Sequence, residues 1–505
     1  MPSLTYENGV FVWHGPYEER EQPKSAKFEW NLAKKRWETR DMFTAARLGL
    51  PCKELQSVLT NIERSLAKTP SYLEPDGLYP YQAAGVECMS EQFALGRTNM
   101  LLADQPGLGK TPQTARLADV MNWKNLLVIC PASLRLNWVR EIERWRKTGS
   151  EPVAVLDSKR FPKPGCTVVV SYDIFVREHW ADVLSLYPFD ALVCDESHYL
   201  KNVDAKRTKA ILGKEGLHKQ IRNTLLLSGT PIPNRAHELF KIVKLFAKEA
   251  FPWSYWDFCG RYHQNVLDGK PRGSRNEDDL YTRLRGSGFM LRRRKEDVLK
   301  DLPPKTHQLV VFPADGSTRK VLQREREFSA QEIIQHGVPV GTSLPEVRRE
   351  MGIAKAPVCA SYVAGLLDGG LEKVVCAAHH TDVIARIAHD LREYGVVVVQ
   401  GDTRPRKRQE AVDRFQTDPQ VRVFVGQLTA AGTGITLTAA SDVVFVEASW
   451  VPGENEQMLD RCHRIGQVNP VLAHYLVVEG SLDAKILGTA AGKAEGIAKI
   501  MDGCL

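Results

Sequence analysis

Residues 100–111 of this chain read Met100-Leu101-Leu102-Ala103-Asp104-Gln105-Pro106-Gly107-Leu108-Gly109-Lys110-Thr111. An apolar strand is followed here by a glycine loop that ends in Lys110-Thr111, and a helical segment, Pro112 to Leu117, comes next. In such a loop, the backbone N–H groups bind phosphate oxygens and the lysine contacts the negatively charged β- and γ-phosphates of a nucleotide. The hydroxyl of the following threonine binds Mg²⁺. The strict P-loop spacing requires glycine where this chain has Asp104, so the alternative is a plain glycine-rich turn. The strand before the loop and the helix after it favour a phosphate site.

Short apolar runs like the one before this loop recur along the chain, separated by amphipathic segments of helical length. One set lies between Leu78 and Phe246, and a second lies between Lys373 and Val446. Apolar strands that alternate with helices indicate parallel, doubly wound sheets, because helices cover both faces of such a sheet. We therefore predict an α/β fold with two doubly wound parallel sheets.

The composition is that of a globular protein, with 505 residues, 43% hydrophobic and 26% charged, and a net charge of +7. At roughly 150 residues per domain, this length allows about three domains. No apolar run is long enough to span a bilayer and the first residues do not resemble a leader, so we expect an intracellular, cytoplasmic protein with no membrane partner. A bacterial nucleoid or a phage-infected cell would suit it. The ten cysteines form no Cys-x-x-Cys pair, which predicts reduced thiols rather than a zinc module.

The chain divides into four predicted parts: an N-terminal accessory and substrate-recognition unit at 1–75, a first lobe at 76–255, a connecting and insertion region at 256–365, and a second lobe at 366–505. The first part alternates aromatic and polar residues on both sides of a short polar turn near Asn31 to Lys35, which predicts a small hairpin unit. This hairpin could simply pack on its neighbours, or its aromatic and basic residues could grip DNA. The sequence leaves both interpretations open.

A second polar motif follows another apolar run, where Ala191-Leu192-Val193-Cys194 leads into Asp195-Glu196-Ser197-His198. Ligand sites of open α/β sheets lie at the carboxyl ends of the strands. An aspartate at that place can hold Mg²⁺, and the next glutamate can polarise a water for attack on a γ-phosphate. An acidic pair after a strand is often only a solvated edge, but its position after Lys110 favours a Walker B element.

Several ordered motifs together resemble those of superfamily 2 helicases. They are Leu78-Tyr79-Pro80-Tyr81-Gln82, Gly107-Leu108-Gly109-Lys110-Thr111, Asp195-Glu196-Ser197-His198, Ser228-Gly229-Thr230-Pro231 and Gln457-Met458-Leu459-Asp460-Arg461-Cys462-His463-Arg464-Ile465-Gly466-Gln467. The end of the last motif, from His463 to Gln467, and the segment Leu291 to Leu299 narrow the resemblance to the Snf2 family. Within that family, the chain looks most like the HARP-like annealing-helicase branch. The segments that carry this resemblance to the branch are Ala377-Ala378-His379-His380, Thr429-Ala430-Ala431-Gly432-Thr433-Gly434 and Ile129-Cys130-Pro131-Ala132-Ser133.

The resemblance implies two RecA-like lobes with an N-terminal accessory unit, and the binding of ATP and Mg²⁺. The residues implied for ATP are Gln82, whose amide matches the adenine edge, with Gly107, Leu108, Gly109, Lys110, Thr111 and Gly434, and those for Mg²⁺ are Thr111 and Asp195. The residues implied for catalysis are Lys110, Asp195, Glu196, Gln457, Arg461 and Arg464. Arg461 and Arg464 are expected on one face of a helix, from which they would reach the γ-phosphate as arginine fingers when the lobes close.

The resemblance also implies contacts along the backbone of one DNA strand, which position a protein without reading sequence. The candidates are Ser133, Ser171, Tyr172, His379, Thr403, Arg404 and Thr429. The basic run that starts at Arg404 could equally be a solvated helix start, and Arg292-Arg293-Arg294-Lys295 could bridge the lobes. A zinc site at His379-His380 is not expected, because adjacent side chains on a strand end point to opposite faces.

On this resemblance, the chain is expected to be an ATP-dependent double-stranded DNA translocase of the Snf2 type, and thus a DNA-dependent ATPase. It would work as a monomer on double-stranded or forked DNA, independently of sequence, to remodel forks or reanneal strands. One alternative is a strand-separating superfamily 2 DNA helicase. Another, of a different class, is an ATP-gated DNA-binding scaffold that does not cycle.

Overall fold

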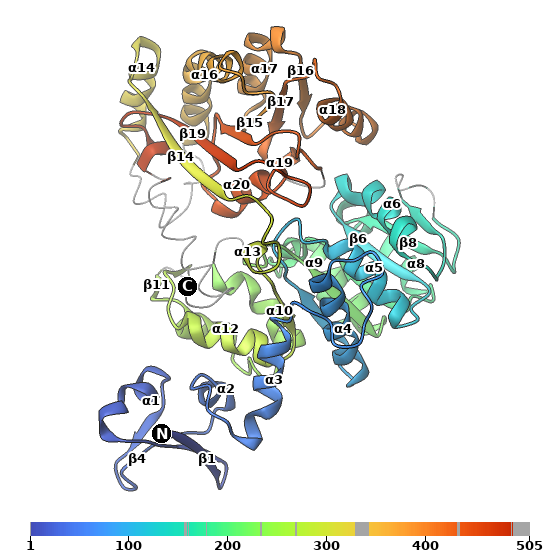
Figure 1. Cartoon of the computed structure of the whole chain (residues 1–505), viewed down its shortest axis with the longest axis vertical. Coiled ribbons are helices and arrows are strands. Elements are labelled where there is room, and N and C mark those ends of the chain that lie inside the picture. The colour runs from blue at the N-terminus through green and yellow to red at the C-terminus, as the bar shows by residue number, and fades with distance from the viewer. Residues whose placement is uncertain are drawn as a thin grey trace. The chain divides into compact units, whose positions relative to one another are not determined.

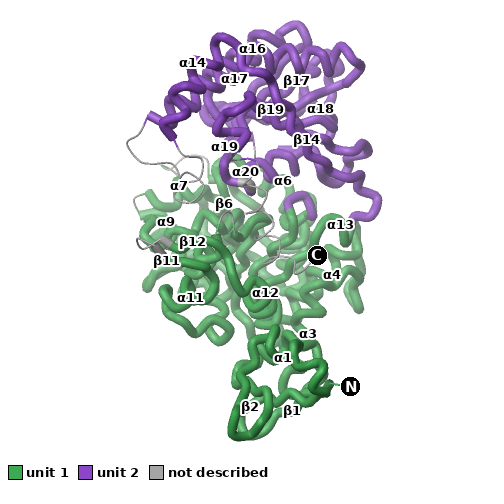
Figure 2. The backbone as a smooth tube through the Cα atoms, turned by 90° about the vertical axis from the view of Figure 1, so that its left-hand side faces the viewer, with its two compact units in different colours: residues 1–105, 109–298, 496–505 green, residues 106–108, 299–495 purple. Residues whose placement is uncertain are grey.

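The computed structural model describes residues 2–155, 159, 161–177, 179–232, 235–267, 270–328, 343–431, 435–485 and 487 (Figure 1). These residues form two compact units, which are coloured separately in Figure 2. The first unit contains the described residues of Met1–Gln105 and Gly109–Val298, and the second contains those of Pro106–Leu108 and Leu299–Glu495. In the described part of the chain, no helix is both long and apolar enough to cross a membrane.

A small antiparallel sheet, blue in Figure 1, opens the first unit with the strand order β1-β2-β4-β3. Its strands are β1 (Ser3–Glu7), β2 (Val10–His14), β3 (Glu29–Asn31) and β4 (Arg36–Thr39). Asn8 and Gly9 join β1 to β2 with positive φ angles of 50° and 81°, as a two-residue hairpin turn requires. β3 pairs with β4 across the polar turn, which confirms the predicted hairpin. The helices of this region are η1 (Tyr17–Glu19), α1 (Glu21–Ser25), α2 (Met42–Ala46), η2 (Lys53–Leu55) and α3 (Gln56–Arg64).

The main sheet of the first unit has the order β13-β5-β10-β9-β6-β8-β7, and its pairings are parallel. Its strands are β5 (Asn99–Leu102), β6 (Leu126–Cys130), β7 (Pro152–Ala154), β8 (Thr167–Ser171), β9 (Ala191–Cys194), β10 (Asn223–Leu227) and β13 (Met290–Leu291). Successive residues of a strand enter opposite core clusters: Leu101 and Ile129 belong to one, and Leu102 and Val128 belong to the other. Both faces of the sheet are therefore buried, as the continuous apolar runs predict.

Helices connect these strands and cover the sheet. They are α4 (Pro80–Ala94), α5 (Lys110–Val120), η3 (Ala132–Leu134), α6 (Arg135–Trp145), α7 (Tyr172–Phe175), α8 (Trp180–Ser185), η4 (Ser197–Leu200), α9 (Lys206–Leu212), η5 (Leu217–Lys219), η6 (Ala236–Leu239), α10 (Phe240–Phe246), α11 (Tyr255–Tyr262), α12 (Glu277–Gly286) and α13 (Lys295–Val298). A separate antiparallel pair, β11 (Asn265–Leu267) with β12 (Lys270–Arg272), lies between α11 and α12 in the chain.

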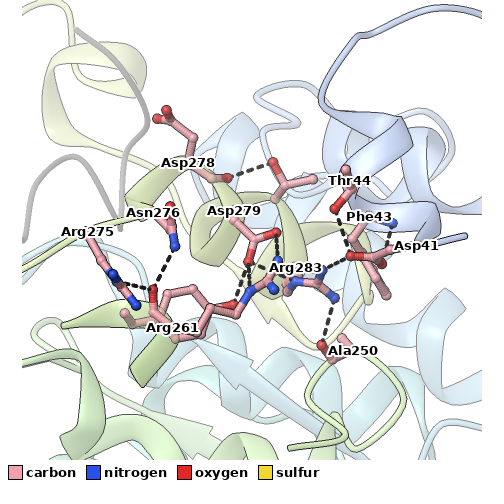
Figure 3. A network of polar contacts seen from close by, with 12 residues as sticks. Asp41, Phe43, Thr44, Ala250, Arg261, Arg275, Asn276, Asp278, Asp279 and Arg283 are labelled. Atoms are coloured by element: carbon pink, nitrogen blue, oxygen red, sulfur yellow. Dashed lines mark hydrogen bonds and ion pairs between the residues drawn. The ribbon is translucent and has the colours of Figure 1, made fainter. Parts of the chain in front are cut away.

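A buried charge cluster at α12 links this helix to α2 (Figure 3). Asp279 accepts hydrogen bonds from Arg261 at 2.9 and 3.0 Å and from Arg283 at 3.0 Å. Arg283 also donates to the carbonyl of Ala250 at 3.1 Å and to the carboxylate of Asp41, which caps α2. Burial by itself would raise the pKa of Asp279, but the hydrogen bonds of Arg261 and the charge of Arg283 lower it to about 2. The cluster is therefore held together by ionised groups.

The second unit is built on a parallel sheet with the order β14-β19-β18-β15-β17-β16. Its strands are β14 (Lys305–Phe312), β15 (Val374–Ala378), β16 (Val396–Val399), β17 (Val423–Gln427), β18 (Asp442–Phe445) and β19 (Val471–Val478). Its helices are α14 (Gly316–Glu325), α16 (Leu344–Asp368), α17 (Thr381–Asp390), η7 (Arg392–Tyr394), α18 (Pro405–Thr417), α19 (Leu428–Ala431) and α20 (Pro452–Leu459). Val375 and Phe424 enter one core cluster while Cys376 and Val425 enter another, so this sheet is also buried on both faces.

The predicted α/β class, with two doubly wound parallel sheets and an additional N-terminal unit, is confirmed. The two compact units divide between Val298 and Leu299, inside the region 256–365 predicted as connection and insertion. β13 pairs with β5 in the first sheet, and β14 pairs with β19 in the second, so parts of this region belong to each sheet. The predicted boundaries at 75, 255 and 365 stay predictions.

Candidate functional site

The predicted phosphate loop connects β5 to α5. Gly107 and Gly109 have positive φ angles of 86° and 74°, a conformation that glycine adopts without steric cost. A Cβ at position 109 would also clash with the Nε2 atom of Gln82. α5 begins directly afterwards, at Lys110, and the first N–H groups of a helix are of the kind that bind phosphate. The local geometry therefore suits the chemistry predicted for this loop.

Two side chains predicted to bind nucleotide, Lys110 and Gln82, lie against the loop. The ammonium of Lys110 donates to the carbonyl oxygen of Asp104 at 2.9 Å. The Oε1 atom of Gln82 accepts the N–H of Tyr79 at 3.0 Å, and its Nε2 atom donates to the Tyr81 hydroxyl at 3.3 Å. Gln82 is thus held by the start of α4 and lies next to Gly109 of the phosphate loop.

Asp104, which stands where the P-loop spacing requires glycine, has its side chain in the protein interior. Its carboxylate accepts the backbone N–H of Arg293 at 2.9 Å, Nε of Arg293 at 3.0 Å and Nε2 of Gln113 at 3.0 Å. The Arg293 guanidinium also donates to Oε1 of Gln113 at 2.6 Å and to the carbonyl of Tyr81. Gly85 of α4 makes room, since a Cβ there would clash with Gln113 and Arg293. Asp104, the residue that departs from the P-loop pattern, therefore anchors the loop to Arg293 and Gln113.

In the basic run from Arg292 to Lys295, Arg292 and Arg293 form hydrogen bonds within the first unit. Arg292 donates to the carbonyl oxygens of Ala103 at 2.7 Å and Gly229 at 3.2 Å, which join the ends of β5 and β10. The sequence suggested a bridge between the lobes for this run, and it gave no indication of these bonds of Arg292 and Arg293 within the first unit. The available signal was the apolar strand β13, which delivers the run from the protein interior.

Asp195 and Glu196 follow β9 directly. The Asp195 carboxylate accepts Nε1–H of Trp138 at 2.8 Å and the backbone N–H of Glu196 at 2.9 Å. Burial raises the pKa of Asp195 to about 6, and the Glu196 carboxylate adds to this rise, while the Trp138 hydrogen bond and the charge of Lys110 oppose it. Glu196 itself has a positive φ of 50°, which is rare outside glycine and asparagine and marks a constrained turn.

A short polar chain connects this acidic pair to the Ser228-Gly229-Thr230 motif. Nδ1 of His198 lies 3.3 Å from Oε2 of Glu196 and 3.3 Å from Oγ of Ser228. The Ser228 hydroxyl in turn accepts the N–H of Thr230 at 3.2 Å. The His198 imidazole therefore lies between the Glu196 carboxylate and the Ser228 turn.

These motifs share one edge of the sheet. β10 pairs in parallel with β5 on one side and with β9 on the other, so the loops that follow these three strands leave the sheet at its carboxyl edge. Ligands of open α/β sheets bind at this edge. The phosphate loop, the Ser228 turn and the Asp195-Glu196 pair are thus brought together by strand order.

The DNA contacts predicted in the first unit follow the next strands of the same edge. Ser133 lies in η3, after β6. Ser171 ends β8, is 1% exposed, and its hydroxyl caps α7 by accepting the N–H of Ile174 at 3.3 Å. Tyr172 is also 1% exposed and donates to the carbonyl oxygen of Asp195 at 2.8 Å. The side chains of Ser171 and Tyr172 therefore support the site from inside the protein.

In the second unit, His379 follows β15 and is held by a buried carboxylate. Glu447 accepts the backbone N–H groups of His379 and His380 at 2.9 Å each, and it lies 2.7 Å from Nδ1 of His380. Burial would raise the pKa of Glu447, but the bonds from His380 lower it. Gln427 donates to the carbonyl of His379 at 3.1 Å. His380 is thus paired with a carboxylate in a polar cluster.

The other DNA contacts predicted in this unit follow β17, which pairs with β15, and β16, which pairs with the far side of β17. The hydroxyl of Thr403 accepts the N–H of Gln400 at 2.9 Å, and the exposed Arg404 precedes α18. Thr429 belongs to α19, directly after β17, and its side chain is outside the described residues, as is Gly434. Strand order therefore places His379, Thr403 and Thr429 at one edge.

The arginines predicted as fingers lie in a turn, which corrects the expectation that they share a helix. α20 ends at Leu459, and both Arg461 and Arg464 come after it. Nε of Arg461 donates to the carbonyl of Gln457, in the last turn of α20, at 3.1 Å. Arg464 donates to the carbonyl of Ile435 at 3.0 Å and to the hydroxyl of Thr436 at 2.9 Å. The turn is therefore fixed by tertiary bonds.

Comparison with known families agrees with this set of motifs. The SNF2-related domain matches residues 81–342, which is more than half of the chain. The chain belongs to the SNF2 family. The helicase conserved C-terminal domain matches residues 363–466 of this SNF2 protein, within the second unit.

The curated relatives of this SNF2 protein carry names from the predicted branch. The DNA annealing helicase and endonuclease ZRANB3 of Homo sapiens is 32% identical over 84% of this chain and 40% of the relative. The SWI/SNF-related matrix-associated actin-dependent regulator of chromatin subfamily A-like protein 1 homolog of Caenorhabditis elegans is 34% identical over 82% of this chain and 60% of the relative. The match therefore spans about half the length of these relatives. The predicted resemblance to the Snf2 family and its annealing-helicase branch is confirmed.

Among solved structures, the SWI2/SNF2 ATPase core of Sulfolobus solfataricus in complex with dsDNA is similar, with a TM-score of 0.40 and 23% identity. It covers 87% of this chain and 99% of that chain.

Proposed function

We propose that this protein is an ATP-dependent double-stranded DNA translocase of the Snf2 type, and hence a DNA-dependent ATPase. The observation that carries the proposal is the meeting of the phosphate loop, the Asp195-Glu196 pair and the Ser228 turn at the ends of three neighbouring parallel strands, with His198 between the last two. Membership of the SNF2 family supports it.

ATP would be bound by the phosphate loop and the residues that lie against it. The loop supplies backbone N–H groups and Lys110 supplies positive charge for the β- and γ-phosphates. The residues we propose for ATP are Gln82, Gly107, Leu108, Gly109, Lys110, Thr111 and Gly434. Gln82 would turn its amide to the adenine edge, and Arg293 would keep the loop in position through Asp104.

The acidic pair fits a divalent cation. Asp195 and Thr111 offer the hard oxygen ligands that Mg²⁺ prefers. Burial and the adjacent Glu196 carboxylate both disfavour the charge of Asp195, and this is the environment that a bound cation stabilises. When bound, Mg²⁺ would neutralise part of the charge on the phosphates. We therefore propose Mg²⁺ as the metal that accompanies ATP.

Hydrolysis would use groups from both units of this chain. Glu196 would orient and polarise the attacking water, and His198 would relay the state of the site to the Ser228 turn. From the second unit, Arg461 and Arg464 would stabilise the charge that develops on the γ-phosphate, positioned by the α20 turn and Gln457.

DNA would be contacted along its backbone, without sequence preference. The residues we propose for these contacts are Ser133, His379, Thr403, Arg404 and Thr429, with Ser171 and Tyr172 supporting the first unit's part from inside. Hydroxyl and cationic groups of this kind bind phosphate oxygens. Each cycle of ATP binding and hydrolysis would advance the protein along duplex DNA as a monomer.

The work done by this movement is proposed to be fork remodelling or the reannealing of separated strands. The support is that curated relatives carry the name DNA annealing helicase. A strand-separating helicase and a scaffold that does not cycle are the competing functions.

The test measures ATP turnover of wild-type protein without DNA and with single-stranded, blunt duplex and forked DNA. Duplex and fork should stimulate turnover. Glu196→Gln should retain ATP binding and lose about 10²- to 10⁴-fold in stimulated turnover. The matched control is Glu143→Gln, an exposed position on α6, which should behave as wild type. Absence of stimulation by every DNA would support the scaffold, and substantial turnover in Glu196→Gln would contradict the role of that carboxylate.

A further inference from the structure

Asp195, the residue proposed to bind Mg²⁺, is held by three other elements of the first unit. Its backbone N–H donates to the carbonyl oxygen of Ile129 on β6 at 2.9 Å. Its own carbonyl oxygen accepts the hydroxyl of Tyr172 on α7 at 2.8 Å. Its Oδ2 atom accepts Nε1–H of Trp138 on α6 at 2.8 Å. Of these three groups, the indole of Trp138 is the one that contacts the carboxylate.

The hydrogen bonds of the Asp195 carboxylate fix its orientation. Oδ1 accepts the backbone N–H of Glu196 at 2.9 Å, while Oδ2 accepts Trp138. Because the two donors bind different oxygens, the carboxylate cannot rotate without breaking one of these bonds. Among the described residues, each oxygen accepts one hydrogen bond, and its second lone pair can bind a cation. Trp138 thus sets the direction in which Asp195 presents its oxygens.

The partner of the Trp138 indole is not explained by packing. Trp138 is 1% exposed and belongs to a hydrophobic core cluster of the first unit. A buried indole N–H needs an acceptor, but a backbone carbonyl would satisfy this need as well. Trp145, at the end of the same helix, donates to the carboxylate of Glu141, one turn earlier on α6, at 3.0 Å. Packing therefore accounts for the buried ring of Trp138, and not for the choice of Asp195 as its acceptor.

The helix that carries Trp138 begins directly after a turn that is proposed to contact DNA. Ser133 lies in η3, and α6 starts at Arg135. Nε of Arg135 donates back to the carbonyl oxygen of Ala132 at 3.0 Å, so a side-chain bond also joins the turn to the helix. Coupling between sites can be carried by rigid secondary elements of this kind. A displacement of the turn would therefore move the Trp138 indole, which lies three residues after Arg135.

We propose that Trp138 is a positioning residue, which orients the Asp195 carboxylate for Mg²⁺ and makes this orientation depend on DNA at the turn before α6. The inference rests on the proposed function, which assigns Mg²⁺ to Asp195 and a DNA contact to Ser133. Hydrogen-bond partners of metal-binding carboxylates orient them and tune metal affinity. A DNA phosphate at Ser133 would adjust the first turn of α6, and the indole would transmit this change to the carboxylate.

The first test removes the indole N–H and keeps an aromatic ring in the core, by Trp138→Phe. Wild type and variant are mixed with a fluorescent, non-hydrolysable ATP analogue and titrated with Mg²⁺. The fluorophore is excited directly, so that the loss of a tryptophan does not affect the signal. Without the indole hydrogen bond, the Mg²⁺ concentration at the midpoint should rise by about 10- to 100-fold.

Trp145→Phe is the matched control, because it removes the other indole N–H of α6, whose acceptor Glu141 has no proposed role. This variant should have the Mg²⁺ midpoint of wild type. Partial unfolding of Trp138→Phe would lower the amplitude of the titration without moving its midpoint, so a merely structural role predicts a different result. An unchanged midpoint in Trp138→Phe, or an equal rise in Trp145→Phe, would overturn the inference.

The second test concerns DNA and separates this inference from the proposed function. At saturating Mg²⁺ and ATP, the ratio of duplex-stimulated to DNA-free turnover should fall towards one in Trp138→Phe. Its affinity for the same duplex without nucleotide should equal that of wild type, since the indole is buried. A wild-type ratio in Trp138→Phe, or a loss of duplex affinity, would overturn the link to DNA. If no DNA stimulates wild-type turnover, the proposed function fails, while the Mg²⁺ midpoint still decides whether Trp138 positions Asp195.

Discussion

Arg293 and Asp104 form a buried ion pair beside the phosphate loop, and Gln113 bonds to both partners. Arg293→Met keeps an unbranched side chain but leaves the Asp104 carboxylate buried without its countercharge. We expect the free energy of unfolding of the first unit to fall by about 3 to 5 kcal/mol. ATP affinity should fall as well, because the loop loses its anchor. Urea denaturation followed by tryptophan fluorescence, and titration with ATP, measure the two effects.

The double variant Arg293→Met with Asp104→Leu is the control for this prediction. With neither charge left unpaired, most of the lost stability should return. ATP affinity should stay low, since the loop still lacks its tie to Arg293 and Gln113. A single variant as stable as wild type would show that the pair contributes nothing to the loop.

Among the site residues, those that depend on local geometry could be predicted from the sequence. The glycines of the phosphate loop and Lys110 mark a strand, a turn and a helix start, all within a few residues. The bond between Arg293 and Asp104 joins positions 189 residues apart, and no local pattern signals it. The burial of Ser171 and Tyr172 was likewise hidden, because hydroxyls after a strand can equally cap a helix or face solvent.

Among the elements, α12 is held in place by buried ion pairs of Asp279 with Arg261 and Arg283. Asp279 has a pKa of about 2 in the folded protein, below the value near 3.9 of an unfolded chain. Its contribution of about 2 kcal/mol is therefore present above about pH 4 and lost as the pH falls towards 2. Asp279→Asn should flatten the fall of the urea midpoint between about pH 5 and pH 3. The neighbouring Asp278→Asn, whose side chain is 43% exposed, is the control, and parallel profiles for Asp279→Asn and wild type would refute the prediction.

The strands of both main sheets were predictable, because a parallel strand buried on both faces is a continuous apolar run. The end of α20 was not. Nε2 of Gln467 donates to the carbonyls of Thr438 at 3.2 Å and Ala440 at 2.8 Å, and Nε2 of His463 donates to the carbonyl of Pro303 at 2.8 Å. These bonds fix the turn that carries Arg461 from residues far away in the chain. Helical spacing alone could not reveal them.

At the scale of the whole molecule, each main sheet carries proposed DNA contacts at its carboxyl edge, and these contacts are hydroxyls and a few cations. The net charge of +7 over 505 residues is small, so the protein should bind DNA weakly and release it readily as salt rises. Contacts to the sugar-phosphate backbone of one DNA strand would hold the protein on duplex DNA, but they would not separate the two strands. Movement and strand separation should therefore be experimentally distinct.

The prediction is that ATP allows this protein to displace a triplex-forming oligonucleotide from a blunt duplex, while the strands of a tailed duplex stay together. Displacement of the third strand requires only travel along the duplex, and the label it releases measures that travel directly. Glu196→Gln should bind the same duplex and release nothing, whereas Glu143→Gln should match wild type. Robust unwinding of the tailed duplex would instead favour a strand-separating helicase. ATP turnover without any third-strand release would mean that hydrolysis is not coupled to movement.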